Sequence, residues 1–453
     1  MFPKGGYLAG VQVAGRTRQS SSSAGAIAIL CGLLLPALVS AQQNVIPLQL
    51  SFSDPGARSM GFGGAFVALA DDATAAFANP AGLTQLIRPE FSIEGRHWSH
   101  TTPYTVGGRV EGLPTGNGLD STDRLRMANS SHDTTGLSFL SYAYPVGKWS
   151  FAAYRHEYAD LEFSGATQGL FGGGTDCCQS RQWDNLWASD MEILSYGISV
   201  AYRLHDDFDI GFSAVYYDAS LDARVEEYFW DEDTIEAFYA PNSYRPEQLV
   251  RSEDMFVDDN DWTINLGFLW QLTESWSIGG VYRDGIAVDM GLRVTAGQVF
   301  DFGVPPGEVI WQLGGVGTEF PDIYGIGAAY RRTDGRLTLS FQWDRVRYSN
   351  IPDSLGIDDQ TIDDANELHV GAEYVFLDST PIIALRFGAW YEPDHQMRPI
   401  IDDPWLEAMT VDGEDEFHYA AGFGLALERS QFDLAVDFSN RVDAVSLSAI
   451  FNF

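Results

Sequence analysis

Apolar and polar residues alternate with a period of two along most of the chain after about residue 90. In residues 444–453, Val445, Leu447 and Phe451 share one face, whereas Ser446 and Ser448 share the other. Strand side chains point alternately to two faces, so this pattern indicates strands with one apolar face. It predicts about fourteen strands, at residues 90–111, 134–145, 149–163, 190–204, 208–229, 260–273, 275–294, 320–333, 336–349, 366–377, 381–393, 416–428, 431–440 and 444–453.

The predicted connections alternate between long loops and tight turns. The long ones are 112–133, 164–189, 230–259, 295–319, 350–365 and 394–415. Outer-membrane barrels have long loops on one side and short turns on the other, and aromatic residues near their strand ends. The pattern therefore predicts an all-β fold, a transmembrane antiparallel barrel, with a soluble two-sheet sandwich as the alternative. A break in the first strand at Pro103 would make the strand count odd.

The first 41 residues have the order of a secretory signal peptide. Basic Lys4, Arg16 and Arg18 precede an apolar stretch from Ala24 to Ala41, which ends in small residues. We expect cleavage after Ala41, and no later apolar run is long enough for a transmembrane helix. The chain is therefore expected to be exported.

Composition excludes several classes of protein. With 27 Lys and Arg against 63 Asp and Glu, the net charge is −36, which argues against general nucleic-acid binding. Three cysteines exclude a disulfide scaffold. Cys177 and Cys178 are adjacent in a predicted outer loop, where a strained vicinal disulfide or an inert pair are both open. The acidic loops present either a solvated surface or Ca²⁺ ligands, although no EF-hand spacing occurs.

Residues 54–83 do not have the pattern of a strand. They read DPGARSMGFGGAFVALADDATAAFANPAGL and include Asn79-Pro80-Ala81. This segment resembles the N-terminal hatch of the FadL/TodX (OMPP1) family of outer-membrane transporters for hydrophobic compounds. Weaker similarity continues at Phe320-Pro321, at residues 371–374 and at the terminal Phe453.

The resemblance implies a fourteen-stranded barrel (90–453) plugged by a hatch (42–89), in the outer membrane of a Gram-negative-type bacterium. It implies passive uptake of hydrophobic small molecules, such as long-chain fatty acids or aromatic hydrocarbons, with a sideways exit where the third strand kinks. Outer-membrane lipid and lipopolysaccharide are the expected surroundings, and a monomer is the expected state. Related barrels serve protein secretion, so an accessory barrel that binds protein partners is the alternative function.

The candidate ligand contacts combine apolar hatch residues with arginines that would hold a fatty carboxylate. They are Phe52, Arg58, Met60, Phe62, Phe66, Phe77 and Arg386. For the apolar residues the alternative is the core of the hatch, and for the arginines it is an internal ion pair.

Two segments are candidates for gating the exit. Asn79, Pro80 and Ala81 are expected to contact the wall, with simple turn chemistry as the alternative. In the third strand the alternation breaks at Arg155, His156 and Glu157, which fits a strand that bends inward. The family often has a glycine at this place, and this chain does not.

No nucleophile, metalloprotease or phosphate-binding motif occurs in the sequence. We therefore predict no enzymatic activity, no cofactor and no metal site. An outer-membrane hydrolase with scattered catalytic residues is a further alternative.

Overall fold

The computed structural model describes residue 52 and residues 54–173, 180–230, 234–299, 302–355, 360–411 and 413–453. The predicted signal peptide, Cys177 and Cys178, and the acidic residues 231–233 and 358–359 lie outside the described residues.

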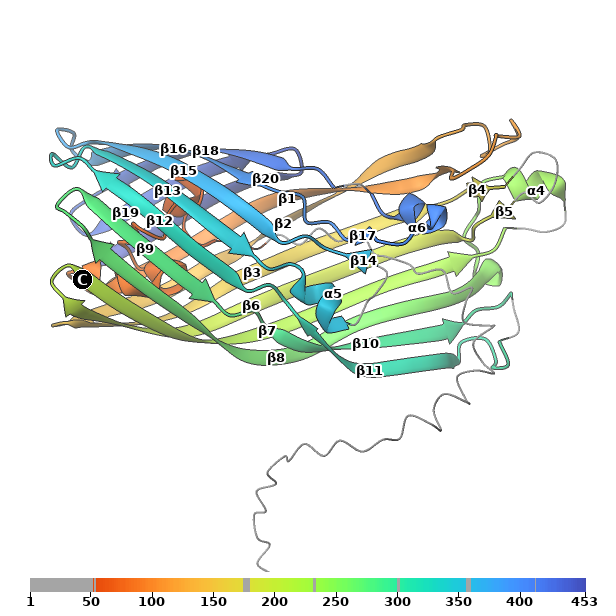
Figure 1. The fold of residues 1–453 in the computed structure, drawn as a ribbon, viewed down its shortest axis with the longest axis horizontal. Coiled ribbons are helices and arrows are strands. Elements are labelled where there is room, and N and C mark those ends of the chain that lie inside the picture. Colours follow the sequence, from red (N-terminus) through yellow and green to blue (C-terminus); the bar gives the residue numbers. More distant parts are fainter. Residues whose placement is uncertain are drawn as a thin grey trace, which may run out of the picture. The chain divides into compact units, whose positions relative to one another are not determined.

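Fourteen antiparallel strands form a closed barrel (Figure 1). The first wall strand, β1 (Glu90–Arg109), pairs with β2 (Leu125–Val146) on one side. On the other side it pairs with the last strand, β20 (Val442–Asn452), which closes the barrel. The alternating pattern therefore predicted the fold class correctly, and the sandwich alternative is wrong.

The remaining wall strands follow in chain order. They are β3 (Trp149–Thr167), β6 (Asp184–His205), β7 (Phe208–Tyr228), β8 (Leu249–Gln271), β9 (Trp276–Arg283) with β10 (Ala287–Ala296), β11 (Val309–Glu319) with β12 (Ile323–Arg331), β13 (Leu337–Val346), β15 (Ala365–Phe376), β16 (Ile382–Glu392), β18 (Glu416–Ala426) and β19 (Ser430–Phe438). β9 and β10 make one interrupted wall strand, because β8 pairs with both. β11 and β12 make the next one, because β11 pairs with β10 and β12 pairs with β9.

Several predicted strand limits are wrong. β2, β6 and β8 begin at Leu125, Asp184 and Leu249, earlier than the pattern indicated, and β11 lies within the predicted loop 295–319. These extensions carry polar residues on both faces, so they lack the apolar alternation that marks a strand. β1 runs unbroken through Pro103, which lies opposite Asn129, so the strand count is even.

The wall is apolar outside and polar inside, the reverse of a soluble protein. Leu447 is 60% exposed and Phe387 is 66% exposed, whereas Ser446 and Ser448 are buried. Aromatic side chains such as Trp149, Trp270 and Trp276 are exposed at strand ends. An outward apolar band bordered by aromatic residues is the surface of a barrel that lies in a bilayer.

Short elements fill the long connections and the N-terminal segment. The connections carry β4 (Leu170–Gly172), β5 (Ser180–Arg181), α4 (Ile235–Tyr239), η2 (Pro246–Gln248), α5 (Asn350–Leu355), β14 (Gln360–Thr361), β17 (Arg398–Pro399) and α6 (Pro404–Met409). The N-terminal segment, defined here as residues 54–86, carries α2 (Ala57–Gly61), α3 (Ala75–Ala78) and η1 (Pro80–Gln85). None of the helices in the described part of the chain is long and apolar enough to span a membrane.

Candidate functional site

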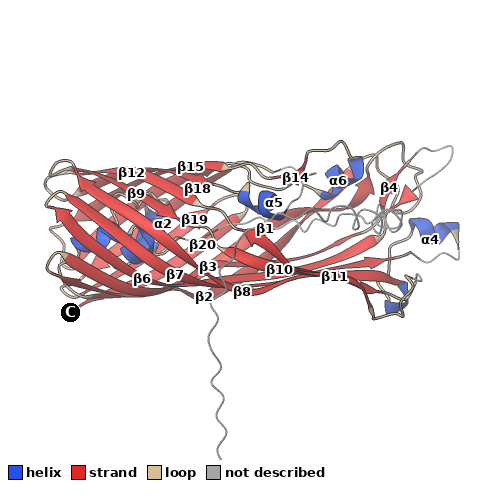
Figure 2. Cartoon of the chain, turned by 60° about the horizontal axis from the view of Figure 1, so that its bottom comes forward, coloured by secondary structure: helices blue, strands red, loops and turns tan. Residues whose placement is uncertain are grey.

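The N-terminal segment packs against inward-facing residues of the wall, and its helices lie among the strands in Figure 2. A Cβ on Gly63, whose φ is +65°, would lie 2.7 Å from the Ala389 backbone nitrogen. A Cβ on Gly371 would overlap the Phe62 carbonyl oxygen. The Gln342 side-chain oxygen accepts hydrogen bonds from the amides of residues 66 and 67, at 3.0 and 2.8 Å. Glycine on both surfaces thus permits direct backbone contact.

Asn79 joins this segment to β8. Its side-chain amide donates to the carbonyl oxygens of Val67, at 2.8 Å, and Phe268, at 3.0 Å, and the residue is fully buried. Its side-chain oxygen accepts from the Ala81 amide at 3.2 Å. A Cβ on Gly211 of β7 would overlap residues 80 and 81. The Asn-Pro-Ala sequence therefore contacts the wall; its role in gating stays a proposal.

We expect Asn79→Ala to loosen the N-terminal segment while the barrel stays folded. The variant removes the donor to the buried Val67 carbonyl oxygen, at about 1–3 kcal/mol for one unsatisfied group, and the hydrogen bond that ties the segment to Phe268. Hydrogen exchange of amides in residues 61–86 is expected to accelerate, while exchange in the strands is unchanged. Asn129→Ala, which alters an exposed asparagine of β2, is the control. Equal exchange in both variants would contradict this role for Asn79.

Arg58 of the segment lies at the centre of an ion-pair cluster that joins the segment to β15. Its guanidinium contacts Asp71 and lies 3.4 Å from Asp72 and 3.6 Å from Glu373. Burial opposes the charge of Asp71, but the Arg58 and Arg331 guanidiniums outweigh it and hold the pKa of this carboxyl well below its usual range. Burial raises the pKa of Asp72. Arg58 thus compensates carboxylates that are hidden from water.

Arg386 belongs to the same cluster. Its guanidinium lies 2.7 Å from Glu373 and 2.6 Å from Asp433, and its side chain is buried. Both predicted carboxylate-binding arginines therefore form internal ion pairs, which is the alternative that the sequence left open.

We expect Arg58→Gln to destabilise the protein by about 3 kcal/mol near neutral pH, because buried Asp72 loses its guanidinium, and Asp71 and Glu373 each lose one of two. The depressed pKa of Asp71 contributes stability above its unfolded pKa of about 3.9, and this contribution is lost as pH falls through the folded value. The deficit of the variant should therefore be constant above about pH 5 and shrink as pH falls below about 4. Urea unfolding across this pH range measures it.

Arg332→Gln is the matched control, because Arg332 pairs with Asp334 on the exposed surface, where such pairs contribute little. A deficit of the same size in both variants, or one that grows at low pH, would contradict the account.

A cavity of about 130 Å³ lies between the N-terminal segment and the wall. Phe52 and Met60, two of the predicted ligand contacts, line it; their contact with a ligand stays a prediction. Phe62, Phe66 and Phe77 instead lie in the buried core of the segment. The aromatic lining is Phe52, Trp98, Tyr158, Tyr348 and Trp390. An apolar cavity of about 150 Å³ accepts benzene, so this space is of the size of one aromatic ring.

The cavity also has a negative lining. Its carboxylates are Asp54, Asp344, Glu367, Glu392 and Asp437. Its guanidiniums are those of Arg96, which lies 2.7 Å from Glu94, and Arg283, which lies 3.6 Å from Asp54. Both arginines are already paired, so the lining offers no unpaired guanidinium to an anionic ligand.

Aromatic rings continue from the cavity toward β3. The ring of Phe52 stacks on Tyr158 at 4.7 Å, and Tyr158 meets Tyr217 at 5.5 Å. Phe77 lies 4.4 Å from the His156 ring. Tyr158 sits at a β-bulge, because the register of β3 against β6 shifts between Glu157 and Ala159.

Backbone pairing between β2 and β3 is interrupted beside this bulge. Pairing between β2 and β3 ends at Phe139 and His156, and residues 157–167 pair with β6 alone. The strands meet again where the Ser164 amide donates to the Ser130 hydroxyl at 3.2 Å. Between these points residues 133–138 and 157–162 share no backbone pairing, although both stretches are fully described. We call this gap in pairing the β2–β3 opening.

The predicted gating residues of β3 lie at one end of the opening. The Arg155 guanidinium contacts the Leu137 carbonyl oxygen and lies 3.6 Å from Glu157. His156 is fully buried against Phe77 and Phe139. A Cβ on Gly136 would lie 3.0 Å from the Glu157 carboxylate. Residues 155–157 are thus placed together at the opening, and their gating role stays a proposal.

Sequence reasoning missed Trp98, Tyr158 and Tyr348 as lining residues, together with the carboxylates and histidines beside them. The sequence feature that could have indicated them is their position among the alternate, inward-facing residues of the predicted strands. Parity alone selects every second residue of each strand, so it does not distinguish the few that reach the cavity.

No known family model matches the chain, and no curated protein matches it. Solved structures are similar in fold. A FadL homologue of Pseudomonas aeruginosa is 13% identical, with a TM-score of 0.58 over 90% of this chain and 100% of that chain. The toluene transporter TbuX of Ralstonia pickettii is 15% identical, with a TM-score of 0.54 over 88% and 98%. A deltaS2 mutant of the monoaromatic hydrocarbon channel TodX is 16% identical, with a TM-score of 0.56 over 89% and 100%. The predicted resemblance is thus confirmed at the level of fold: this chain is a FadL/TodX-like barrel.

Proposed function

We propose that the protein takes up small neutral aromatic hydrocarbons across the outer membrane by diffusion. The observation that carries this proposal is a ring-sized cavity with aromatic walls inside a barrel whose outer surface suits a bilayer. The similar fold of TodX, a monoaromatic hydrocarbon channel, and of TbuX, a toluene transporter, supports the same ligand class.

The charge of the cavity favours a neutral ligand over a fatty acid. A fatty carboxylate would meet five carboxylates, and the two guanidiniums and two imidazoles of the lining already face carboxylates of the protein. Burying an anion without a counter-ion costs several kcal/mol, whereas a neutral ring pays no such penalty. The volume of about 130 Å³ also suits one ring better than a long alkyl chain.

In the proposed route, the N-terminal segment acts as a plug that denies water a continuous channel. A hydrocarbon enters the cavity, passes the rings of Phe52 and Tyr158, and leaves through the β2–β3 opening into the bilayer. The apolar solute then reaches lipid without crossing an aqueous pore, which removes the cost of hydrating it.

Equilibrium binding tests this proposal. The purified barrel in lipid nanodiscs should bind labelled toluene saturably, and a long-chain fatty acid should not displace it. Empty nanodiscs give the partitioning background. Toluene signal no greater than this background, or displacement by the fatty acid at equal concentration, would overturn the ligand class.

A further inference from the structure

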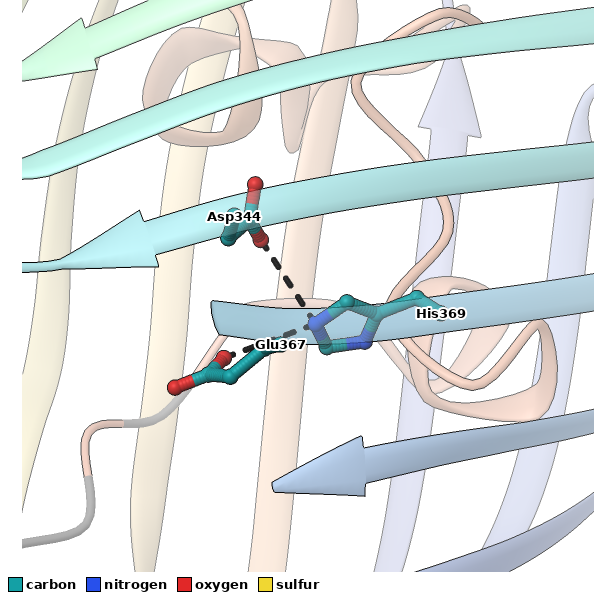
Figure 3. A group of neighbouring side chains, drawn as sticks. All are labelled: Asp344, Glu367 and His369. Atoms are coloured by element: carbon teal, nitrogen blue, oxygen red, sulfur yellow. Dashed lines mark ion pairs between the residues drawn. The ribbon is translucent and has the colours of Figure 1, made fainter. Parts of the chain in front are cut away.

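His369 of β15 faces two carboxylates from neighbouring positions of the wall (Figure 3). Its Nε2 atom lies 3.6 Å from Asp344 Oδ2 and 3.5 Å from Glu367 Oε2. One donor atom from each of the three residues lies within 4.8 Å of the others. Asp344 and His369 are buried, and Glu367 is half-buried. We call these three residues the histidine–carboxylate cluster.

The tautomer of His369 is set by the N-terminal segment. The Nδ1 atom lies 2.8 Å from the Gly63 carbonyl oxygen. A carbonyl oxygen only accepts, so Nδ1 carries the hydrogen and donates it. In a neutral ring, Nε2 then directs a lone pair at two carboxylates. Neither Nε2 nor Asp344 Oδ1 has a hydrogen-bond partner, although both atoms are buried.

The strand register concentrates negative charge at this place. Asp344 lies directly opposite Glu367 across β13 and β15. Like charges at such a position destabilise a sheet unless a cation lies between them. No Arg or Lys of the described residues forms an ion pair with either carboxylate; both carboxylates lie within ion-pair distance of His369 instead. Among the described residues, the cluster therefore has no guanidinium or ammonium group within ion-pair distance.

A second histidine of the wall shows the contrast. His418 Nε2 lies 3.4 Å from Glu392 and 3.6 Å from Glu416. There Arg441 lies 3.6 Å from Glu416, and His418 Nδ1 lies 2.9 Å from an Asp437 oxygen. That site has its own guanidinium, and the histidine–carboxylate cluster does not.

We propose that Asp344, Glu367 and His369 bind a divalent transition-metal ion of the Zn²⁺ class. A tetrahedral zinc ion with bonds of 2.0–2.2 Å holds its donor atoms about 3.4 Å apart, close to the spacing of Nε2 and the two carboxylates. One imidazole with two carboxylates suits zinc better than calcium or magnesium, which take oxygen ligands. A metal-bound histidine usually donates its other ring hydrogen to a carbonyl or carboxylate, as His369 does to Gly63.

The metal would brace the N-terminal segment against the wall. It holds the imidazole through Nε2, and the same ring holds the segment through Gly63. The contact is close, because a Cβ on Gly64, whose φ is +74°, would lie 2.9 Å from His369 Nδ1. Metal binding therefore links β13 and β15 to residues 63 and 64 through one side chain.

Zinc binding to the purified, chelator-treated full barrel tests the proposal without any hydrocarbon, so its outcome is independent of the proposed uptake. Calorimetric titration with Zn²⁺ should show one site that Ca²⁺ and Mg²⁺ at equal concentration do not fill. His369→Gln and Asp344→Asn should each weaken Zn²⁺ binding by about 100-fold or more, the upper end of what even outer-shell changes cost. Hydrogen exchange at residues 61–67 should slow when Zn²⁺ is added to the native protein.

Two control variants each replace one other histidine by glutamine, as His369→Gln does. His418→Gln removes another buried histidine with carboxylate neighbours, and His97→Gln removes one on the exposed face of β1; both should keep the zinc site. Native protein without a site would mean that His369 is an imidazolium paired with its carboxylates, which overturns the proposal. Zinc binding that survives His369→Gln but is lost in His418→Gln would also overturn it.

Discussion

Ala444→Trp is expected to abolish both toluene binding and toluene uptake. Ala444 lies on β20, lines the cavity and is 4% exposed. An indole at this position would occupy much of a cavity of about 130 Å³. Overpacking at such a site also costs about 1–3 kcal/mol, so the amount of folded barrel must be measured with the binding.

Ala449→Trp is the control for this variant. Ala449 lies on the same strand with the opposite parity, so its side chain points away from the cavity. Equal amounts of folded barrel with normal binding in Ala449→Trp, and none in Ala444→Trp, would assign the loss to the cavity. Normal binding in Ala444→Trp would exclude this cavity as the binding site.

Gly136→Trp is expected to separate binding from release. Gly136 lies at the β2–β3 opening, with its Cβ position 3.0 Å from the Glu157 carboxylate and outside the cavity lining. A bulky side chain here should obstruct the opening while the cavity keeps its affinity for toluene. Uptake should fall by about tenfold or more, which corresponds to a barrier raised by at least about 1.4 kcal/mol.

Gly95→Trp is the control for the second variant. Gly95 lies on β1, directly opposite Leu137 of β2, and its position on the wall is exposed. The same indole at this position should leave uptake unchanged. If Gly136→Trp binds and takes up toluene normally, the ligand does not leave through the β2–β3 opening.

The architecture was predictable because the bilayer imposes its pattern on every strand. Residues such as Leu447 and Phe451 must face lipid, and their neighbours must not, so alternation and loop lengths suffice to predict the barrel. The N-terminal extensions of β2, β6 and β8 were not predicted, because their outer faces carry polar residues and so do not show the apolar alternation of strands that face lipid. The seventh wall strand is interrupted between Arg283 and Ala287, and the alternation of apolar and polar residues did not predict this interruption either.

The candidate site was predictable only in part. Phe52 and Met60 line the cavity, whereas Phe62, Phe66 and Phe77 lie in the core of the segment. The sequence does not separate the two groups, because the packing of the segment decides which apolar side chains face the cavity. The register shift between Glu157 and Ala159 lies next to Arg155, His156 and Glu157, where the sequence breaks the alternation; the predicted inward bend stays a prediction.

The histidine–carboxylate cluster could not be predicted. Glu367 and His369 are two residues apart on one strand, but Asp344 joins them only through the register of β13 and β15. Register depends on all the cross-strand pairs together, so no short motif in the sequence encodes it.

Uptake of labelled toluene by cells without a transporter of their own tests the central claim most directly. Cells that carry this protein at confirmed surface expression should accumulate toluene faster than cells with the empty vector, with saturation and without competition from a long-chain fatty acid. Uptake no faster than in the vector control, or faster uptake of the fatty acid alone, would contradict the claim that this barrel admits neutral aromatic hydrocarbons.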